Sequence, residues 1–356
     1  MKRSYIKLAT LLLTTVCLAC IVDPDLKPQY TGFEPEALAD GWEISTPVAE
    51  GMDSLRIASV YEQLFSEDRY PTLQSLLVVR NGKLVAEAYS RDPRDRDRFH
   101  HVQSVTKSIT SLLVGIAMEE GLAPSLDTPL YDLMPDYFDG DTRKRTITLR
   151  HALTMRTGLE FENDEDAAWL MFTPGSSIRN VLGRPLVSEP GAAYYYSDGT
   201  PQLLSGAIKS VTGVTLEEYA QDRLFGPLGI DDYQWEKHAD GLNFGGFGLW
   251  LLPRDMAKIG QLMLQGGTWE GREVVPPGWI EEATRVYVNG NYGHYWWVAE
   301  ENSVFSARGA GGQIIQVDAR NNLVIVLTCD HASKSWVLSP GIDKLFGGIY
   351  QALESQ

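Results

Sequence analysis

Strand-forming sequence lies near both ends of this chain of 356 residues, and helical sequence lies between them. Residues 73–90 contain two β-rich runs joined by Asn81-Gly82, the dipeptide most typical of a tight hairpin turn. Strand patterning returns near the other end, at residues 292–299, 313–319 and 322–330. Strands from the two ends must therefore pair into one mainly antiparallel sheet, with the helical segment as an insertion.

Helical patterns fill most of the remaining chain. The longest apolar pattern runs from about residue 104 to 120 and is stopped by Gly121. Further helices are predicted within residues 146–161 (ended by Gly158), 201–213 (Gly213), 215–230 (Gly226), 253–267 and 339–353. The fold class is therefore α+β, with a sheet lobe over about residues 51–113 and 243–356 and a mostly helical lobe over about 114–242.

The N-terminus has the pattern of an export signal. Residues 1–20 combine a basic start with an apolar stretch too short to span a bilayer comfortably. Leu18-Ala19-Cys20 resembles a bacterial lipoprotein cleavage site, which makes Cys20 a candidate for lipidation; plain secretory cleavage nearby is the alternative. Residues 21–50 are expected to form a tether and an N-terminal arm. Cys329 is then the one thiol expected in the core of the folded part.

The chain carries a formal net charge of -16. A surface this acidic repels phosphate backbones and anionic lipids, which argues against a nucleic-acid partner. The histidines have no metal-ligand spacing, and the carboxylates of residues 136–142 are better explained by an acidic loop than by a calcium site. No metal and no cofactor are expected.

Ser104 and Lys107 stand at the start of the longest predicted helix, three residues apart. This spacing puts both side chains on one helix face, and the positive end of the helix dipole favours a serine alkoxide. Burial would lower the pKa of the lysine and provide a neutral amine to accept the serine proton. The same spacing recurs at Ser4 and Lys7 without such a context. Spacing alone therefore leaves open whether Ser104 and Lys107 are a catalytic pair or an ordinary serine and lysine on a helix.

Six stretches together carry a family resemblance. They are SVTKSITSLLVGIAMEEG, ITLRHALTMRTGL, PGAAYYYSDGTPQLLSGAI, LFGPLGI, GGFGLWLLPRDMAKIGQLML and ARGAGGQIIQV. In this order they resemble the serine β-lactamase and penicillin-binding-protein-like hydrolases, from about residue 50 to the C-terminus. That superfamily includes class C β-lactamases, esterases, D-aminopeptidases and 6-aminohexanoate-dimer hydrolases. The stretches PRDMAKIGQLML and GAGGQ are most similar to the last branch, so the resemblance implies a β-lactamase/transpeptidase-like fold.

The resemblance implies a role for each matching position. Ser104 would be the acylated nucleophile, Lys107 its activating partner, and Tyr196 the group that relays a proton to the leaving group. The family motif Tyr-x-Asn is matched by Tyr196-Ser197-Asp198, so a carboxylate replaces the usual amide. Asp198 could raise the pKa of Lys107 and blunt its role as a base, or favour an amine-bearing substrate. In a rival register, Ser197-Asp198-Gly199 would imitate the Ser-Asp-Asn of class A enzymes.

The family's third motif, Lys-Thr-Gly or His-x-Gly on a strand, is replaced by Ala307-Arg308-Gly309. Gly309 would let substrate approach the strand closely, and the amides of Ser104 and Ala310 would form the oxyanion hole. Recognition of a β-lactam carboxylate is in doubt without the Lys-Thr pair. Strand alternation would point Arg308 away from Ala307 and Gly309.

Two tryptophans are further candidates for the substrate cleft. Trp297 follows Trp296 on a predicted strand, so one is expected in the core and the other in the cleft. Trp169 is expected in an acidic, irregular loop, where it would cap the pocket or pack beneath it. Tyr194 and Tyr195 are expected to be packing residues.

The sequence therefore predicts an exported serine hydrolase that forms an acyl-enzyme at Ser104 and acts on a small ester, amide or short peptide. Ester cleavage ranks first, and cleavage of aminohexanoate oligomers or D-amino-acid amides ranks second. β-Lactamase or D,D-peptidase activity ranks third. A hypothesis from another class is a catalytically silent envelope protein that binds peptidoglycan fragments or a partner in the same cleft.

Overall fold

The structure is a computed structural model that describes residues 29–354, apart from 66–69, 71, 122, 162, 289, 302 and 331–340. The candidate export signal, Cys20 and the start of the tether lie outside the described residues, as does His331. Among the described residues, no helix is long and apolar enough to cross a membrane.

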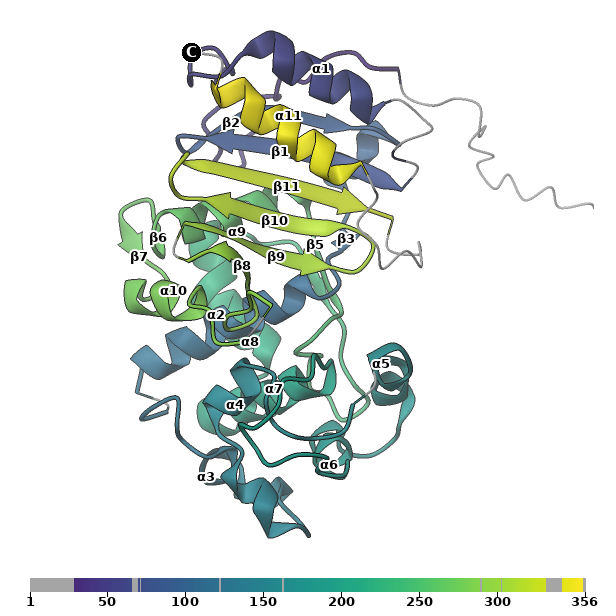
Figure 1. The fold of residues 1–356 in the computed structure, drawn as a ribbon, viewed down its shortest axis with the longest axis vertical. Helices are drawn as coiled ribbons and strands as arrows, with labels where there is room; N and C mark the ends of the chain where they lie inside the picture. Colours follow the sequence, from purple (N-terminus) through teal and green to yellow (C-terminus); the bar gives the residue numbers. More distant parts are fainter. Residues whose placement is uncertain are drawn as a thin grey trace, which may run out of the picture.

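A six-stranded antiparallel sheet combines the two ends of the chain, in the order β2-β1-β11-β10-β9-β8 (Figure 1). Its strands are β1 (Leu73–Arg80), β2 (Lys83–Tyr89), β8 (Trp297–Glu300), β9 (Val304–Gly309), β10 (Gln313–Asp318) and β11 (Leu323–Cys329). Two smaller sheets contain β3 (His100–His101), β5 (Leu249–Leu251) and β4 (Gln234–Trp235), and β6 (Thr268–Trp269) and β7 (Arg272–Glu273). The central pairing of β1 with β11 joins residues about 250 positions apart, as the sequence pattern requires.

The helices are α1 (Ser54–Leu64), α2 (Val105–Glu119), α3 (Leu130–Leu133), α4 (Leu149–Leu153), α5 (Asn163–Phe172), α6 (Ser177–Leu182), α7 (Gly199–Thr212), α8 (Leu216–Ala220), α9 (Pro253–Leu264), α10 (Pro277–Ala283) and α11 (Ile342–Glu354). Figure 1 shows α3 to α7 gathered below the sheet, as a mostly helical part of the molecule. The α+β fold class predicted from the sequence is confirmed.

Side-chain alternation along the central strands creates a core on each face of the sheet. Leu76 and Val78 of β1 face α1 and α11, where they join one apolar cluster. Leu77 and Val79 face the other way and join a larger cluster with α2, α7 and α9. The larger cluster surrounds α2, which is buried along nearly its whole length and therefore holds its first turn firmly.

The local turn signals are largely confirmed. Asn81 and Gly82 both have positive φ, at 52° and 81°, which is the backbone of the expected two-residue hairpin. Helix α2 ends at Glu119, next to Gly121 at φ 76°, and α7 ends at Gly213 in the left-handed region.

Four local expectations are wrong in detail. Gly226 does not close α8, because the chain continues through a π-helical turn, Gln221–Phe225, to the left-handed Gly229. Helix α4 ends at Leu153, before the predicted stop at Gly158. Strand β8 begins at Trp297, so residues 292–296 of the run predicted as a strand lie outside it. Trp169 lies in α5 and not in an irregular loop.

The described part of the N-terminal arm runs along the edge of β2. Ser45 donates its backbone N–H to Leu84 O at 3.1 Å, and Trp42 is buried. Arg254 of α9, which is 4% exposed, holds the arm through Asp40 and β2 through Glu87. This buried, paired cation ties the arm to the sheet.

Candidate active site

Ser104 stands at the first turn of α2 and leaves its hydroxyl uncommitted to the helix backbone. Ser104 is the N-cap residue, but its side chain makes no capping hydrogen bond. Thr106 Oγ1 instead donates to Gln103 O at 2.7 Å, and Gln103 adopts a left-handed φ of 53°. A left-handed backbone is uncommon for a residue with a Cβ and is a form of strain found at functional sites. Ser104 itself is partly exposed.

Lys107 is the buried partner of Ser104. Its side chain is 1% exposed, and Nζ donates to Ser104 Oγ at 2.9 Å. Nζ also donates to Gly246 O at 3.0 Å and to Asp198 Oδ1 in a short ion pair. An ammonium group has three hydrogens and no lone pair, so it can donate to all three of these acceptors at once. The resting site is therefore built for the charged form of the lysine.

The pKa of Lys107 differs from the direction expected from burial alone. Burial opposes the charge on the ammonium, but the carboxylate of Asp198 and the phenol of Tyr196 outweigh it and raise the pKa above its usual value. The expectation of a lysine neutralised by burial is thus wrong. The alternative raised by the departure at Asp198, a lysine held in its charged form, agrees with the structure.

Tyr196 and Asp198 lie on either side of Ser197, directly before α7. Ser197 Oγ accepts from the backbone N–H groups of Gly199 and Thr200, at 3.1 and 3.0 Å, and so caps the helix. Asp198 makes no capping bond with its side chain, which turns to Lys107 instead. Lys107 Nζ lies 4.9 Å from the centroid of the Tyr196 ring. The register in which Tyr196 and Asp198 face the lysine is the one that the structure adopts.

Aromatic side chains support Tyr196. Trp297 stacks on its ring with the centroids 6.1 Å apart, and Tyr292 meets the same ring edge-on at 6.0 Å. Trp297 is partly exposed while Trp296 is fully buried, which is the division of roles expected for this pair. Tyr194 also packs on Tyr292, but Tyr195 is 45% exposed, so the expectation that Tyr195 is a packing residue is wrong.

Strand β9 passes close to the residues before Ser104. A side chain at Gly309 would overlap the Val102 carbonyl oxygen, so only glycine allows this approach. Ala307 is fully buried, and Arg308 donates to Ser306 Oγ at 2.8 Å, which places these two side chains on the face opposite Ala307. Ala310 follows at the turn that leaves β9.

Gly246 is a part of the site that the sequence did not single out. Its carbonyl accepts from Lys107, and a Cβ on Gly246 would crowd the Asp198 backbone. A Cβ on Gly245 would come even closer to its neighbour, Pro201 O. The run of glycines in residues 245–248 was the available signal, because closely packed backbone requires glycine.

Trp169 is not brought to this cluster by any described contact. The guanidinium of Arg184 lies over its ring, 4.3 Å from the centroid, and also faces Phe161 at 5.7 Å. Phe161 in turn packs against Gly199 at the start of α7. Trp169 therefore lies behind the site and not at Ser104.

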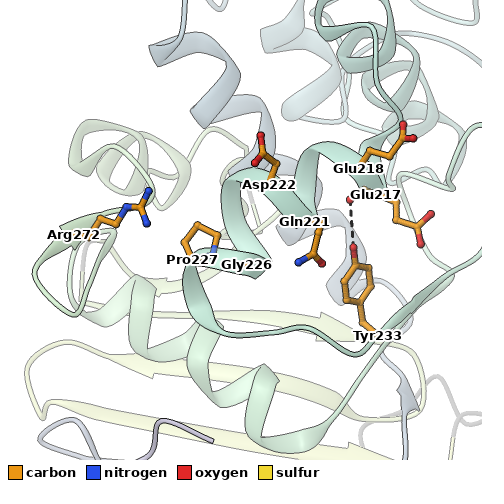
Figure 2. Close-up of a pocket in the computed structure, with 8 residues that line it drawn as sticks. All are labelled: Glu217, Glu218, Gln221, Asp222, Gly226, Pro227, Tyr233 and Arg272. Carbon is orange, nitrogen blue, oxygen red and sulfur yellow. Dashed lines mark hydrogen bonds between the residues drawn. The ribbon is translucent and has the colours of Figure 1, made fainter.

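Two other features of the described residues are separate from this cluster. Figure 2 shows an open cavity of about 700 Å³ lined by acidic side chains of residues 217–222, with Tyr233 and Arg272; Tyr233 Oη donates to Glu217 O at 3.4 Å. None of the proposed site residues lines this cavity. Within the described part of the chain, no group of three His, Cys, Asp or Glu residues could hold a metal ion.

Comparisons with known proteins identify related sequences and a related fold. The family model described as Beta-lactamase matches residues 48–336. The chain is 25% identical over 279 residues to the 6-aminohexanoate-dimer hydrolase of Paenarthrobacter ureafaciens, covering 71% of each protein. It is 29% identical over 167 residues to the lovastatin esterase of Penicillium rubens, covering 41% of each.

A solved penicillin-binding-protein homologue from Caulobacter crescentus superposes with a TM-score of 0.69 at 15% identity, over 84% of this chain and 97% of that one. At such low identity this likeness shows the fold. The match of the family model over most of the chain shows more: the chain belongs to the Beta-lactamase family, whose relatives here include hydrolases of the esterase and amidase type.

Proposed function

We propose that this protein is a serine hydrolase that forms an acyl-enzyme at Ser104 and releases the acyl group to water. The observation that carries the proposal is the 2.9 Å hydrogen bond from the buried Nζ of Lys107 to Ser104 Oγ. The Ser104 side chain makes no hydrogen bond that caps α2, so its hydroxyl is available to Lys107. A serine with a positioned amine is the arrangement that activates a hydroxyl for attack on a carbonyl.

The proposed reaction has two halves. Lys107 first gives one proton to solvent, and the neutral amine then takes the proton of Ser104 as Oγ bonds to the substrate carbonyl carbon. The amides of Ser104 and Ala310 stabilise the oxyanion. Tyr196 delivers a proton to the leaving alcohol or amine as its bond to the carbonyl breaks, and regains a proton from Lys107. Water then attacks the acyl-serine, which releases the acid and restores the Ser104 hydroxyl.

We propose small esters as the first substrate class, because the leaving group of an activated ester depends least on the proton delivered by Tyr196. The relatives named as a 6-aminohexanoate-dimer hydrolase and a lovastatin esterase support amide and ester substrates in general. β-Lactams rank last, since Ala307 is buried and apolar where the family has a cationic side chain.

A second candidate function is a binding protein without turnover. The ion pair of Lys107 with Asp198 favours it, because a lysine held as an ammonium is a poor base. The two candidates differ in whether Ser104 becomes acylated.

The direct test is covalent labelling of the purified protein with a fluorophosphonate probe, followed by mapping of the modified peptide. A mass increase on the peptide that contains Ser104, together with turnover of p-nitrophenyl acetate, is the expected result. Absence of both would favour the binding protein. A parallel panel of D-amino-acid amides, aminohexanoate oligomers and nitrocefin would rank the substrate classes.

Export, with attachment to a membrane through a lipid on Cys20, is also proposed, on the sequence of residues 1–20 alone. Expression in a bacterial host with radiolabelled palmitate should label the wild type and not Cys20→Ala. Labelling of neither protein, with release into the medium, would favour plain secretion.

Replacing Asp198 with asparagine is expected to move the acid limb of the pH–rate profile to lower pH. The carboxylate raises the pKa of Lys107, so its loss lowers that pKa and makes the neutral amine available at lower pH. The measurement is kcat/KM for p-nitrophenyl acetate between about pH 5 and 10. Asp255→Asn is the matched control, because Asp255 is also a buried partner of a lysine, Lys258 at 3.0 Å. An Asp198→Asn profile identical to that of the wild type would show that the carboxylate does not control the base.

A further inference from the structure

The pairing of β10 with β11 stops one residue before the end of β10 and two residues before the end of β11. The last pair in the register is Ile314 with Leu327, and Gln313 precedes it in β10. Gln313 is fully buried, and its side-chain amide reaches across to the backbone of Cys329. Nε2 donates to Cys329 O at 2.6 Å, and Cys329 N–H donates to Oε1 at 3.1 Å. The carboxamide thus replaces the backbone of a paired strand, with one donor and one acceptor.

Because the Gln313 side chain pairs with Cys329, the backbone of residues 310–312 is not needed as a paired strand. Gly311 and Gly312 adopt φ values of 81° and 105°, which other residues rarely adopt, and Gly312 N–H donates to Gly309 O at 3.2 Å. Residues 310–312 therefore form a tight turn and do not extend β10, although Gly312 still contacts Cys329 of β11. The turn leaves Gly309 directly opposite Gln313 in the β9–β10 register.

Gly309 is also the residue that touches the segment before the nucleophile. A Cβ on Gly309 would meet Val102 O, Gln103 Cβ and Gln313 Cβ. Gln313 therefore packs against the same glycine that sets the distance between β9 and Ser104. Any shift of Gln313 is passed to the turn that carries Ala310, because well-packed interiors do not absorb small displacements.

We propose that Gln313 is the positioning residue of the oxyanion-binding turn 310–312; this rests on the proposed role of Ala310 in acyl transfer at Ser104. Gln313 touches no substrate. Its side chain binds the backbone of Cys329 at the end of β11, where a neighbouring strand would otherwise pair. This contact fixes the amide of Ala310 relative to Ser104.

The role requires both halves of the carboxamide. Gln313→Met keeps the length but leaves the N–H and C=O of Cys329 without partners, and Cys329 is only 2% exposed. Gln313→Glu keeps the acceptor and loses the donor when ionised, which sets a carboxylate against Cys329 O. Protonation restores the donor, and burial raises the pKa of such a carboxyl toward neutrality.

The test compares Gln313→Met and Gln313→Glu with the wild type for kcat and KM on p-nitrophenyl acetate and for the rate of fluorophosphonate labelling. Gln316→Met is the matched control, because Gln316 lies on the same strand and bonds Tyr350 Oη at 3.0 Å. We expect kcat and labelling to fall about 100-fold in Gln313→Met with little change in KM, the size of effect typical of a misplacement near 1 Å. Gln316→Met should keep wild-type rates.

For Gln313→Glu, the rate relative to the wild type should rise as the pH falls, because the protonated side chain again donates to Cys329 O. If circular dichroism shows that Gln313→Met does not fold, the pH dependence of the Gln313→Glu rate relative to the wild type tests the positioning role instead. A folded Gln313→Met with wild-type rates, or a ratio independent of pH, would overturn the positioning role while leaving the hydrolase standing. A wild type that is not labelled at Ser104 would overturn both.

Discussion

Replacing Ser104 with alanine is expected to reduce kcat for p-nitrophenyl acetate by at least about a thousandfold, to the background rate of the buffer. Ser104 Oγ is the atom proposed to bond to the substrate, and it accepts a hydrogen bond from Lys107 Nζ at 2.9 Å. Steady-state kinetics and intact-mass measurement after incubation with the fluorophosphonate probe would check both turnover and acylation.

Ser108→Ala is the matched control. Ser108 lies one turn further along α2, is equally part of the buried helix, and donates to Tyr295 O at 2.6 Å. Loss of that hydrogen bond should lower the free energy of unfolding by about 1 kcal/mol and leave turnover close to that of the wild type. If Ser104→Ala retained wild-type turnover, or Ser108→Ala lost labelling, the nucleophile would not be Ser104.

The parts of the fold that could be predicted are those encoded by local chemistry. Asn81-Gly82 specifies a hairpin turn because both residues tolerate positive φ, and the apolar runs on either side can only be strands. The pairing of β1 with β11 followed from having strand sequence at both ends and helices between them. Each of these inferences needs only the sequence within one element or the order of the elements.

The parts that could not be predicted depend on contacts between distant segments. Nothing in residues 215–230 reveals that α8 continues into a π-helical turn, Gln221–Phe225, or that Gly226 after it adopts helical angles and does not end the helix. Trp169 follows several acidic residues, yet α5 forms around it, and the ring is held by Arg184 from a later segment. Tertiary packing overrides local preference in such places.

In the candidate site, too, local sequence predicts some features, and others depend on contacts between distant segments. Ser104 and Lys107 meet because they are one helical turn apart, which the sequence states directly. The sequence does not determine the protonation state of Lys107, because that state depends on where Asp198 and the Gly246 carbonyl lie in space. Burial alone predicted a lowered pKa, whereas the nearby carboxylate raises it.

Replacing Lys107 with methionine is expected to reduce kcat/KM about a thousandfold and to lower the free energy of unfolding by about 3–5 kcal/mol. The activity falls because the group that takes the Ser104 proton is lost. The stability falls because Asp198, whose side chain is 10% exposed, is left as a buried carboxylate without its counter-ion. Urea unfolding and kinetics on the folded protein would measure the two effects separately.

The double variant Lys107→Met/Asp198→Asn separates stability from chemistry. Removing both charges should restore most of the free energy of unfolding, because a neutral buried pair carries no uncompensated charge, while kcat/KM stays low. Lys258→Met is the control: Lys258 is 2% exposed and pairs with Asp255, so its loss should also destabilise the fold but leave turnover per folded molecule intact. Recovery of activity in the double variant would mean that Lys107 is a structural cation and that another group, with Tyr196 the first to test, takes the serine proton.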